Sequence, residues 1–497
     1  MTPSQSFQPT GNQVLLGSVL TIWVWIGLAA WLNQSQINDS LEPYIWAQSF
    51  EWGYWKHPPL TTWLMYVSLH WVGPSPYWPY VLSGLTYAVT VWASHRIARL
   101  LFDLDIAAWV ALLLTLHYGF TRRAQLYNHN SVLVAFIALT AWVTLLALRD
   151  QKYRLWLGAG LLGGLSLLVK YQAAVPLAGI VVAVLATHHV HQVRKGLAWA
   201  MAVAALVFAP HLLWAHQHDF EPFRYALRYV DANALDDPVM RQGAFWVNQL
   251  RYHLPMLFFA LCVWTIGLVR RSTGPDKHEA TLSLRQKLWL GGLLVLPLGF
   301  IVFISLAMGA RVQSHWGLQA SQFMVLAVAF WMWRKQGPIA TRHLWVWVVV
   351  QMISMSIFAA QGLGLIRYDT QRQAVRSMPA ESMTTQAMAF WATRTHCPLK
   401  YLAGDAAMGA MMSAYSGQRL KVLEDSDPRK SPWIDLQQMQ KDGFLALSVR
   451  SSASTDADTL DLPYRLNSHG PMGDEFEYHL QVQYHAPTLV CDIDPRR

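Results

Sequence analysis

Long apolar runs separated by short polar turns make up most of the chain. They cover residues 13–32, 77–102, 104–120, 130–148, 155–169, 172–188, 196–215, 252–269, 288–308, 318–333 and 343–366. A bilayer core about 30 Å thick is crossed by about 20 residues of apolar helix. The pattern therefore predicts about eleven transmembrane helices, of which the third, fifth and sixth are the shortest.

The pattern changes after the last apolar run, where Asp, Ser, Gln and turn-forming residues become frequent. Residues 398–417 predict a strand, a turn and a helix that ends at a glycine. Residues 443–449 predict a buried strand, and residues 476–485 alternate like an edge or half-exposed strand. We therefore expect a mainly α, polytopic transmembrane domain at residues 1–366 and a small α/β domain at residues 367–497.

The composition supports a membrane protein. Of the 497 residues, 54% are hydrophobic and 13% are charged, whereas soluble proteins usually carry about 25% charged residues. The net charge of +9 would suit a nucleic-acid-binding protein, but the Lys and Arg residues gather in alternate turns between the apolar runs. Cytoplasmic turns of membrane proteins are enriched in these residues. The charge therefore predicts an orientation and no nucleic-acid partner.

The positive turns place the N-terminus in the cytoplasm. These turns lie near residues 95–99, 149–154, 194–195, 270–287 and 334–342. The other connections and the C-terminal domain then lie outside, and they comprise residues 33–76, 121–129, 170–171, 216–251, 309–317 and 367–497. The first twelve residues contain no Lys or Arg, so we expect no cleavable signal. Cys397 and Cys491 could pair in an oxidising compartment, or they could be free thiols.

The first outer segment, residues 33–76, contains two short amphipathic stretches at about 40–51 and 60–71. Neither is long enough to span a bilayer, and both suit helices that lie in the membrane interface. Asp39 follows the first apolar run directly, so it is a candidate helix N-cap or a general base at the membrane surface. Lys56 and His57 precede two prolines. They suit a phosphate at headgroup depth, or a snorkelling Lys and a wedged His.

These residues carry a resemblance to a known family. The series Asp39, Trp46-Ala47-Gln48, Trp52-Gly53-Tyr54 and His57-Pro58-Pro59-Leu60 resembles the first periplasmic loop of the bacterial dolichyl-phosphate-mannose protein mannosyltransferase-like family, which includes aminoarabinose transferases that modify lipid A. Less specific similarities occur at Trp156, Gly160, Gly164-Leu165, Lys170-Tyr171, Ala209-Pro210-His211, Trp214 and residues 397–435. The resemblance implies a GT-C-like fold and an inverting transfer of a sugar from a polyprenyl (undecaprenyl) phosphate.

The chain departs from the family pattern at two positions. The family usually has adjacent Asp and Glu at the catalytic position, but here Asp39 is followed by Ser40, and Glu42 is a displaced second carboxylate. The lipid A branch has a Lys before the two prolines, where this chain has His57, with Lys56 one residue earlier. A phosphate contact from His57 would depend on pH.

The resemblance and the positions of the residues together assign roles. Asp39 is the expected base and Glu42 its orienter or a second acid. The candidate groups for the donor phosphate are Lys56, His57, Lys170, Tyr171, Arg122, Arg123 and Arg311, and the candidate substrate-loop residues are Tyr54, His211, His315 and Trp316. No metal ligands are assigned, although a divalent metal is not excluded, and the signals from Asp231, Asp236 and Asp237 and from His188, His189 and His191 are weak. Residues 216–251 are expected to form a mobile loop over the site.

Two other functions fit the same sequence. One is a secondary transporter of a lipid-linked or small polar substrate, and the other is a non-catalytic binding protein of the cell envelope. For the enzyme, the expected location is the bacterial inner membrane with the C-terminal domain in the periplasm. The acceptor stays open among lipid A, another glycolipid, a polysaccharide and a protein.

Overall fold

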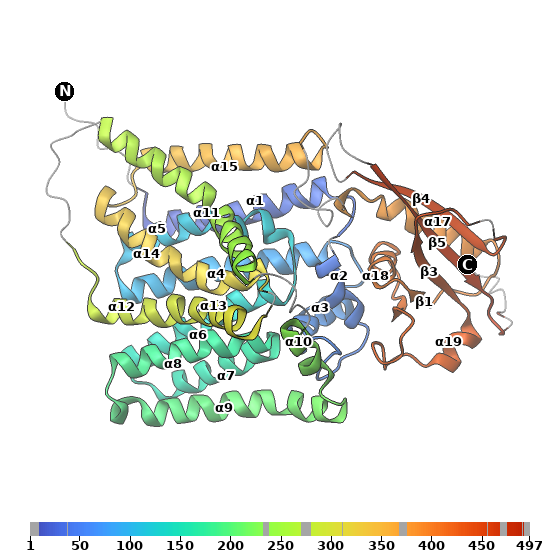
Figure 1. Ribbon diagram of the computed structural model, residues 1–497, viewed down its shortest axis with the longest axis horizontal. Helices are drawn as coiled ribbons and strands as arrows, with labels where there is room; N and C mark the ends of the chain where they lie inside the picture. Colours follow the sequence, from blue (N-terminus) through green and yellow to red (C-terminus); the bar gives the residue numbers. More distant parts are fainter. Residues whose placement is uncertain are drawn as a thin grey trace.

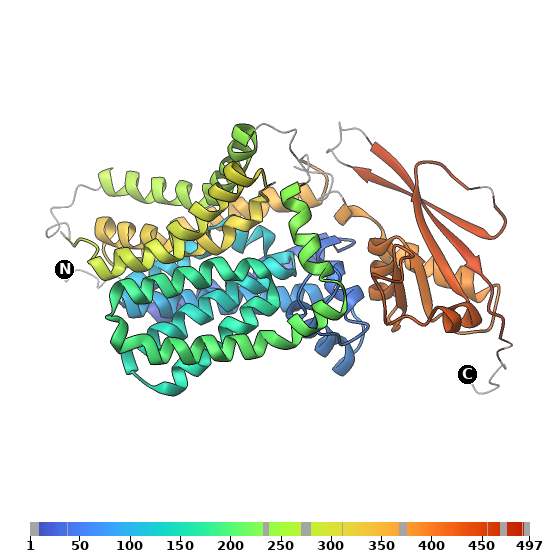
Figure 2. The ribbon, with the colours of Figure 1, turned by 60° about the horizontal axis from the view of Figure 1, so that its bottom comes forward.

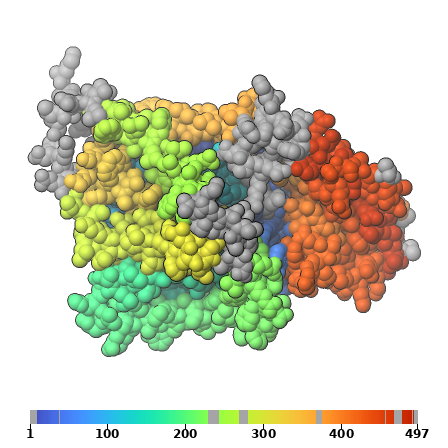
Figure 3. Space-filling model, viewed as in Figure 1, coloured from blue at the N-terminus to red at the C-terminus, as the bar shows by residue number. Residues whose placement is uncertain are grey.

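The computed structural model contains a bundle of long helices followed by a mixed β-sheet with helices on it (Figure 1). It describes residues 9–36, 38–231, 238–269, 280–310, 312–366, 375–454, 456–467, 475–489 and 491. The predicted boundary between two domains at 366 and 367 falls beside residues 367–374, outside the described part, so the division stays a prediction. In the space-filling view the C-terminal residues, in orange and red, lie against one end of the bundle (Figure 3).

Within its described residues, the helical part has fifteen numbered α-helices and five short 3-10 or π segments. The α-helices are α1 (Gly11–Leu32), α2 (Asn38–Trp46), α3 (Leu60–Trp71), α4 (Trp78–Leu101), α5 (Leu104–Leu114), α6 (His129–Asp150), α7 (Tyr153–Val169), α8 (Ala174–Thr187), α9 (Val190–Gln217), α10 (Glu221–Asp231), α11 (Pro238–Val269), α12 (Leu284–Leu290), α13 (Leu296–Met308), α14 (Leu318–Gln336) and α15 (Thr341–Gly362). The short segments are η1 (Tyr118–Phe120), η2 (Arg122–Gln125), η3 (Tyr171–Ala173), η4 (Gly291–Val295) and η5 (Ser314–Gly317).

Each of the eleven apolar runs is largely helical. Within the described residues, six helices are long and apolar enough to cross a membrane, and a seventh candidate is the pair formed by α5 and residues Tyr118–Gln125, which is bent by 78°. The chain is thus a polytopic membrane protein, and the count of eleven stays a prediction. The helices α7 and α8 are short, at 17 and 14 residues, as the pattern indicated.

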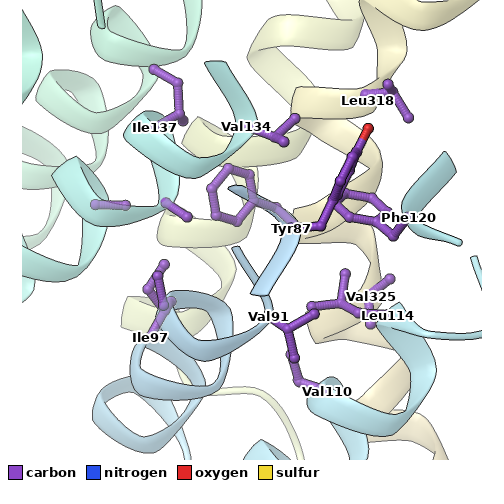
Figure 4. Packing of buried hydrophobic residues seen from close by; sticks show 14 of the residues in the cluster. Tyr87, Val91, Ile97, Val110, Leu114, Phe120, Val134, Ile137, Leu318 and Val325 are labelled. Atoms are coloured by element: carbon purple, nitrogen blue, oxygen red, sulfur yellow. The ribbon is translucent and has the colours of Figure 1, made fainter. Parts of the chain in front are cut away.

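The core of the bundle forms where α4, α5, α6 and α14 meet (Figure 4). Tyr87 and Val91 of α4 lie beside Leu114 of α5 and Phe120 of η1, and Val134 of α6 is close by. These side chains are almost completely buried. Because lipid is as apolar as the core, tight packing rather than water exclusion holds such helices together.

Glycines allow α7 to approach α9 closely. A Cβ atom on Gly160 would collide with the Ala200 carbonyl oxygen, and one on Gly164 would collide with Val207. A Cβ atom on Gly163, on the same helix, would find its nearest neighbour at 3.7 Å, which is ordinary van der Waals contact. The α7–α9 contact therefore needs glycine at Gly160 and Gly164 but not at Gly163.

Short helices cover the end of the bundle that faces the C-terminal sheet, which we call the outer end. The helices α2, α3 and α10 lie between the ends of the long helices and the C-terminal sheet (Figures 1 and 2). The expectation for residues 60–71 is confirmed by α3, whereas α2 ends at Trp46 and Asp39 lies in its first turn rather than before it. The expected loop at residues 216–251 is wrong for the described residues, because α9, α10 and α11 occupy most of it.

The C-terminal region is α/β, as expected. Its elements are α17 (Ala380–Ala392), β1 (Tyr401–Gly404), α18 (Ala406–Tyr415), β2 (Lys421–Glu424), α19 (Leu436–Asp442), β3 (Phe444–Arg450), β4 (Thr459–Asn467) and β5 (Glu475–His485), with the 3-10 turn η6 (Val375–Ser377) before them. The strand order is β2-β1-β3-β5-β4, with β1 parallel to both neighbours and β5 antiparallel to both.

Two details of this region were open in the sequence. The strand β5 lies between β3 and β4, so its interpretation as an edge strand is wrong, although Leu480 and Val482 are buried while Gln483 is exposed. Cys397 and Cys491 form a disulfide, with their Cα atoms 5.3 Å apart. The bond joins the segment before β1 to the segment after β5.

The glycines of α7 provide a test of this packing. We expect Gly160→Ala to lower the stability by about 1–3 kcal/mol, because the added methyl group overfills a backbone contact. The matched change Gly163→Ala should be neutral or stabilising by up to about 1 kcal/mol, since alanine favours helix and has room there. Thermal unfolding in detergent measures both variants, and equal midpoints for the two would contradict the close approach of α7 and α9.

Candidate active site

A cavity of about 680 Å³ lies at the outer end of the bundle, and charged side chains gather in its wall. Residues from α1, α2, η1, η2, α11, η5 and α15 line it. The charged or titratable members other than tyrosines are Asp39, Arg122, Arg123, Arg251 and His315. These five side chains come from four segments that are far apart in sequence, and the tertiary structure brings them together. We refer to this space as the charged cavity.

Asp39 is held at the rim of the charged cavity by the start of α2. It is half-buried and lies in the first turn of that helix, where the helix dipole favours a carboxylate. Ser40, which occupies the place of the family's second acid, is fully buried and accepts a hydrogen bond from the Tyr127 amide at 3.1 Å. The replacement therefore has a structural use, because it ties α2 to the segment that follows η2.

The paired arginines of η2 line the charged cavity together with Asp39. Arg122 is 8% exposed, and its guanidinium lies 4.9 Å from the ring centre of Tyr118. Arg123 lies 5.9 Å from the ring centre of Tyr252 and interacts electrostatically with Asp39. A sharp bend between α5 and the turns Tyr118–Gln125 brings both arginines back into the protein. Arg251 of α11, which the sequence did not suggest, joins them in the wall.

Lys56 and Glu42 form an ion pair and a hydrogen bond. Burial, the largest single cause, lowers the pKa of Lys56, but Glu42 and Tyr225 together outweigh burial and raise the pKa above its ordinary value. The ammonium lies 5.2 Å from the ring centre of Tyr225 in α10 and 5.6 Å from that of Trp55. Lys56 is therefore a charged, well-oriented group, and Glu42 is the residue that orients it.

His57 lies in a crowded cationic environment. Its ring centre is 4.0 Å from that of His129, and the ring also interacts with Lys170, Lys56 and His315. The ring retains some exposed surface, yet the protein around it and the neighbouring positive charges lower its pKa well below the ordinary value. His57 is consequently neutral near pH 7, so it can form hydrogen bonds to a phosphate but does not supply charge.

Lys170 emerges where α7 ends. Its ammonium donates to the Asn130 side-chain oxygen at 2.8 Å and lies 5.9 Å from the ring centre of Trp316. Burial lowers the pKa of Lys170 to about 8, although Asp39 and Glu42 act in the opposite direction. The lysine expected from the sequence therefore interacts electrostatically with both expected carboxylates, and it loses its charge just above neutral pH.

Tyr171 and His211 hold the first outer segment in place. The His211 ring donates from Nδ1 to the Trp52 carbonyl at 2.7 Å, so in its neutral form Nε2 accepts from the Tyr171 hydroxyl at 2.8 Å. A Cβ atom on Gly53 would collide with Trp214 and His211, which explains the glycine at this position. These residues brace the loop from α9 and η3.

Tyr54 lies inside the loop itself. Its hydroxyl donates to the Ser49 carbonyl at 2.8 Å, and its ring stacks on Trp46 with centres 5.5 Å apart. His315 faces the charged cavity, whereas Trp316 lies beside Lys170 and its carbonyl accepts from Gln172 at 3.4 Å. Arg311, Asp236 and Asp237 lie outside the described residues, as does the side chain of Asp231.

The C-terminal sheet region contacts the same loop through Glu424 of β2, which the sequence analysis did not suggest. One carboxylate oxygen of this 4% exposed residue accepts from the Trp46 indole at 2.9 Å and from the Trp55 indole at 3.1 Å. Burial raises the pKa of Glu424, while the two indole donors oppose the increase. The only sequence signal was a carboxylate directly after the two apolar residues Val422 and Leu423 of β2, and nothing in the local pattern indicates its partners.

Apolar packing and a hydrogen bond from a backbone amide also hold the first outer segment against the C-terminal sheet region. Leu41, Ile45 and Trp46 of α2 belong to the same buried cluster as the core of the C-terminal domain. The Val422 amide of β2 donates to the Gln48 side chain at 2.7 Å. The first outer segment is thus held between the bundle and the sheet. In the part of the chain that is described, no group of three or more His, Cys, Asp and Glu side chains is arranged to hold a metal ion, and this includes His188, His189 and His191.

Comparisons with known proteins agree with this architecture. Residues 56–214 match the family model of dolichyl-phosphate-mannose-protein mannosyltransferases. The chain is 24% identical over 285 residues to RgtD, a lipid A galacturonosyltransferase of Rhizobium johnstonii, and the match covers 57% of this chain and 57% of that enzyme. The chain thus spans little more than half the length of this curated relative.

Solved structures resemble the chain over nearly its whole length. Two crystal structures of ArnT from Cupriavidus metallidurans, one bound to undecaprenyl phosphate and one in the apo state, each superpose with a TM-score of 0.59 and 14% sequence identity. Each covers 97% of this chain and 99% of the ArnT chain. At this identity the likeness concerns the fold. The chain therefore shares the fold of ArnT, and its sequence matches to the mannosyltransferase model and to RgtD are in keeping with that fold.

Proposed function

We propose that this chain is an integral-membrane inverting glycosyltransferase that moves a sugar from a polyprenyl phosphate to a hydroxyl group of an envelope acceptor. The observation that carries the proposal is the charged cavity, whose lining includes Asp39 together with Arg122, Arg123, Arg251 and His315. A carboxylate beside a group of cations is what a displacement at a sugar phosphate requires, because one group must take a proton and others must stabilise a leaving phosphate.

The reaction that we propose is a single displacement. The acceptor oxygen attacks the anomeric carbon while its proton passes to the Asp39 carboxylate. The bond between that carbon and the phosphate oxygen breaks, and its electron pair leaves with the polyprenyl phosphate. One displacement inverts the anomeric centre. The half-buried position of Asp39 at the cavity wall suits this role, since a base must reach both the cavity and an incoming hydroxyl.

The excess of positive charge supports an anionic donor. The cations Lys56, Lys170, Arg122, Arg123 and Arg251 outnumber the carboxylates Asp39 and Glu42 around the site. Cations gathered in a poorly solvated space repel one another, and a phosphate would relieve that repulsion. ArnT, which shares the fold, was solved bound to undecaprenyl phosphate, and this supports a polyprenyl phosphate as the carrier.

The acceptor and the location follow from the relatives and from the disulfide. RgtD acts as a lipid A galacturonosyltransferase, so we propose an envelope glycolipid such as lipid A as the first acceptor to test. The Cys397–Cys491 bond supports a C-terminal domain in the periplasm, because disulfides persist in oxidising compartments. The cytoplasmic N-terminus and the inner membrane are proposed with it.

The Asp39 carboxylate is tested by its neutral isostere. We expect Asp39→Asn to lower the rate of sugar transfer about 10²–10⁴-fold, which is the usual contribution of a general base. Transfer is measured by mass spectrometry of the acceptor after incubation with the purified lipid-linked donor. Asp105→Asn, an exposed carboxamide change at the start of α5, is the control. Unchanged transfer by a folded Asp39→Asn protein would refute the assignment.

Lys170 predicts a pH dependence. With a pKa of about 8, the side chain is charged below that pH and becomes neutral as the pH rises through it, so kcat/KM should fall on the alkaline side. Lys170→Arg should move that fall to higher pH, because a guanidinium stays protonated. Lys170→Met should lower transfer about 10²–10³-fold at pH 7. If kcat/KM of Lys170→Arg falls at the same alkaline pH as that of the unchanged protein, the assignment of Lys170 to the donor phosphate is refuted.

Glu424 tests whether the C-terminal domain positions the loop. Its two indole bonds use one oxygen, so the amide oxygen of Glu424→Gln can accept both and should preserve kcat. Glu424→Ala should lower kcat roughly 10–100-fold. The loop that carries Glu42 and Lys56 loses both indole hydrogen bonds, and a small displacement of reacting groups lowers the rate strongly. The exposed change Glu477→Ala is the control. Equal kcat values for the glutamine and alanine variants would contradict a positioning role.

A further inference from the structure

A second cavity, of about 610 Å³, lies at the junction of the bundle and the C-terminal domain. Its walls come from the end of α1, the segment that leads into α4, the first turns of α17 and the end of α18. Figure 1 shows α17 beside the outer end of α1. This volume is within the range of small-molecule sites in proteins. We refer to this space as the polar cavity.

The polar cavity differs from the charged cavity in its chemistry. Its lining includes no Lys, Arg or His among the described residues, and Glu381 is its only carboxylate. The other polar groups are amides and hydroxyls, including Asn33, Thr385 and Gln386. Such groups donate and accept hydrogen bonds without carrying charge. The polar cavity therefore suits a ligand rich in hydroxyl groups and gives no counter-charge to a phosphate.

Aromatic side chains add the second part of a saccharide site. Trp31 is 73% exposed and Tyr77 is 60% exposed, and both belong to the lining. An exposed aromatic face packs against the C–H face of a sugar ring, while amides and carboxylates bind its hydroxyls. On α17, Thr385 follows Ser382 by three residues and Glu381 by four, so its side chain is a neighbour of each of them on the helix surface. All three residues are exposed and line the polar cavity.

The position of these aromatics also indicates the depth of the cavity. Trp31 lies in the last turn of α1, a helix apolar enough to cross a membrane, and Tyr77 precedes α4. Exposed Trp and Tyr residues at the ends of such helices lie at the level of the lipid headgroups. A ligand of the polar cavity is therefore expected at headgroup depth, where the head of a glycolipid lies.

A chain of hydrogen bonds connects the two cavities. The Asn33 amide donates to the Tyr80 hydroxyl at 2.9 Å and to the Gln125 side-chain oxygen at 2.7 Å. Gln125 lines the charged cavity and donates to the Arg122 carbonyl at 3.0 Å. Because Tyr80 and Asn33 line the polar cavity, a ligand there contacts the same network that holds η2.

We propose that the polar cavity binds the uncharged saccharide part of a membrane glycolipid. That the bound lipid is the acceptor for the charged cavity rests on the proposed function, whereas the binding itself does not. The saccharide would pack on Tyr77 and Trp31 and form hydrogen bonds with Gln386, Thr385 and Glu381. The acceptor would thereby be held next to the charged cavity by contacts that take no part in the displacement.

The binding is tested on the full-length protein in phosphatidylcholine nanodiscs. The probe is glucosyl diacylglycerol, and bound lipid is quantified by native mass spectrometry. We expect retention of the probe over sugar-free diacylglycerol and over phosphatidylglycerol. Gln386→Leu should weaken retention about 5–10-fold, the effect of one lost hydrogen bond, and Tyr77→Ala should weaken it by a similar factor. Both positions are exposed, so the fold should tolerate the changes.

Matched controls and a competition complete the test. Gln437→Leu on α19 and Tyr153→Ala on α7 change exposed residues of the same types outside the lining, and they should leave retention unchanged. Asp39→Asn should also retain the probe, so a failure of the proposed catalysis is separate from a failure of this site. Equal retention of diacylglycerol, or no effect of Gln386→Leu and Tyr77→Ala, would overturn the proposal. Full displacement of the probe by an equal concentration of soluble methyl glucoside would overturn the requirement for a lipid-linked saccharide.

Discussion

The outer end of the bundle depends on keeping several positively charged side chains together where little water reaches them. Such an arrangement is costly unless opposite charges lie close by. Glu42 pairs directly with Lys56, Asp39 interacts with both Lys170 and Arg123, and His57 is neutral because the surrounding charges and burial oppose its protonation. The site keeps a net positive charge, and the pKa values of Lys56, His57 and Lys170 differ from their ordinary values. Shifted pKa values of this kind are frequent at functional sites.

The loop that carries these groups is stabilised from two sides, and neither side is near it in sequence. From the bundle, His211 donates to the Trp52 carbonyl and Gly53 allows close contact with Trp214. From the sheet, Glu424 accepts from two indoles of the loop. The C-terminal sheet region is therefore part of the site's framework, because a site is positioned more accurately when rigid elements support it.

The two cavities divide the outer surface by chemistry. The charged cavity contains the arginines and Asp39, and the polar cavity contains amides, hydroxyls and exposed aromatic rings. The bond between Asn33 and Gln125 connects them. A lipid-linked substrate has a charged or hydroxyl-rich head at the membrane surface, so two neighbouring spaces of different polarity suit two different lipids. The fold positions both spaces at the ends of helices, where polar groups can meet lipid headgroups.

By itself the sequence determined the helical, membrane-embedded character of the chain and the α/β character of the tail, because hydropathy and residue periodicity are local properties. The roles of Asp39 and Lys170 were predicted from their positions and from the family resemblance, and they remain proposals. The sequence did not determine that the described part of residues 216–251 is mostly helical, or that β5 lies inside the sheet. Nor did it indicate that Tyr225 and Glu424 contact the first outer segment, or that Arg251 lines one cavity with Asp39. Only the tertiary structure decided these points. The partners of each are distant in sequence, and a contact between distant residues leaves no periodic pattern in either segment.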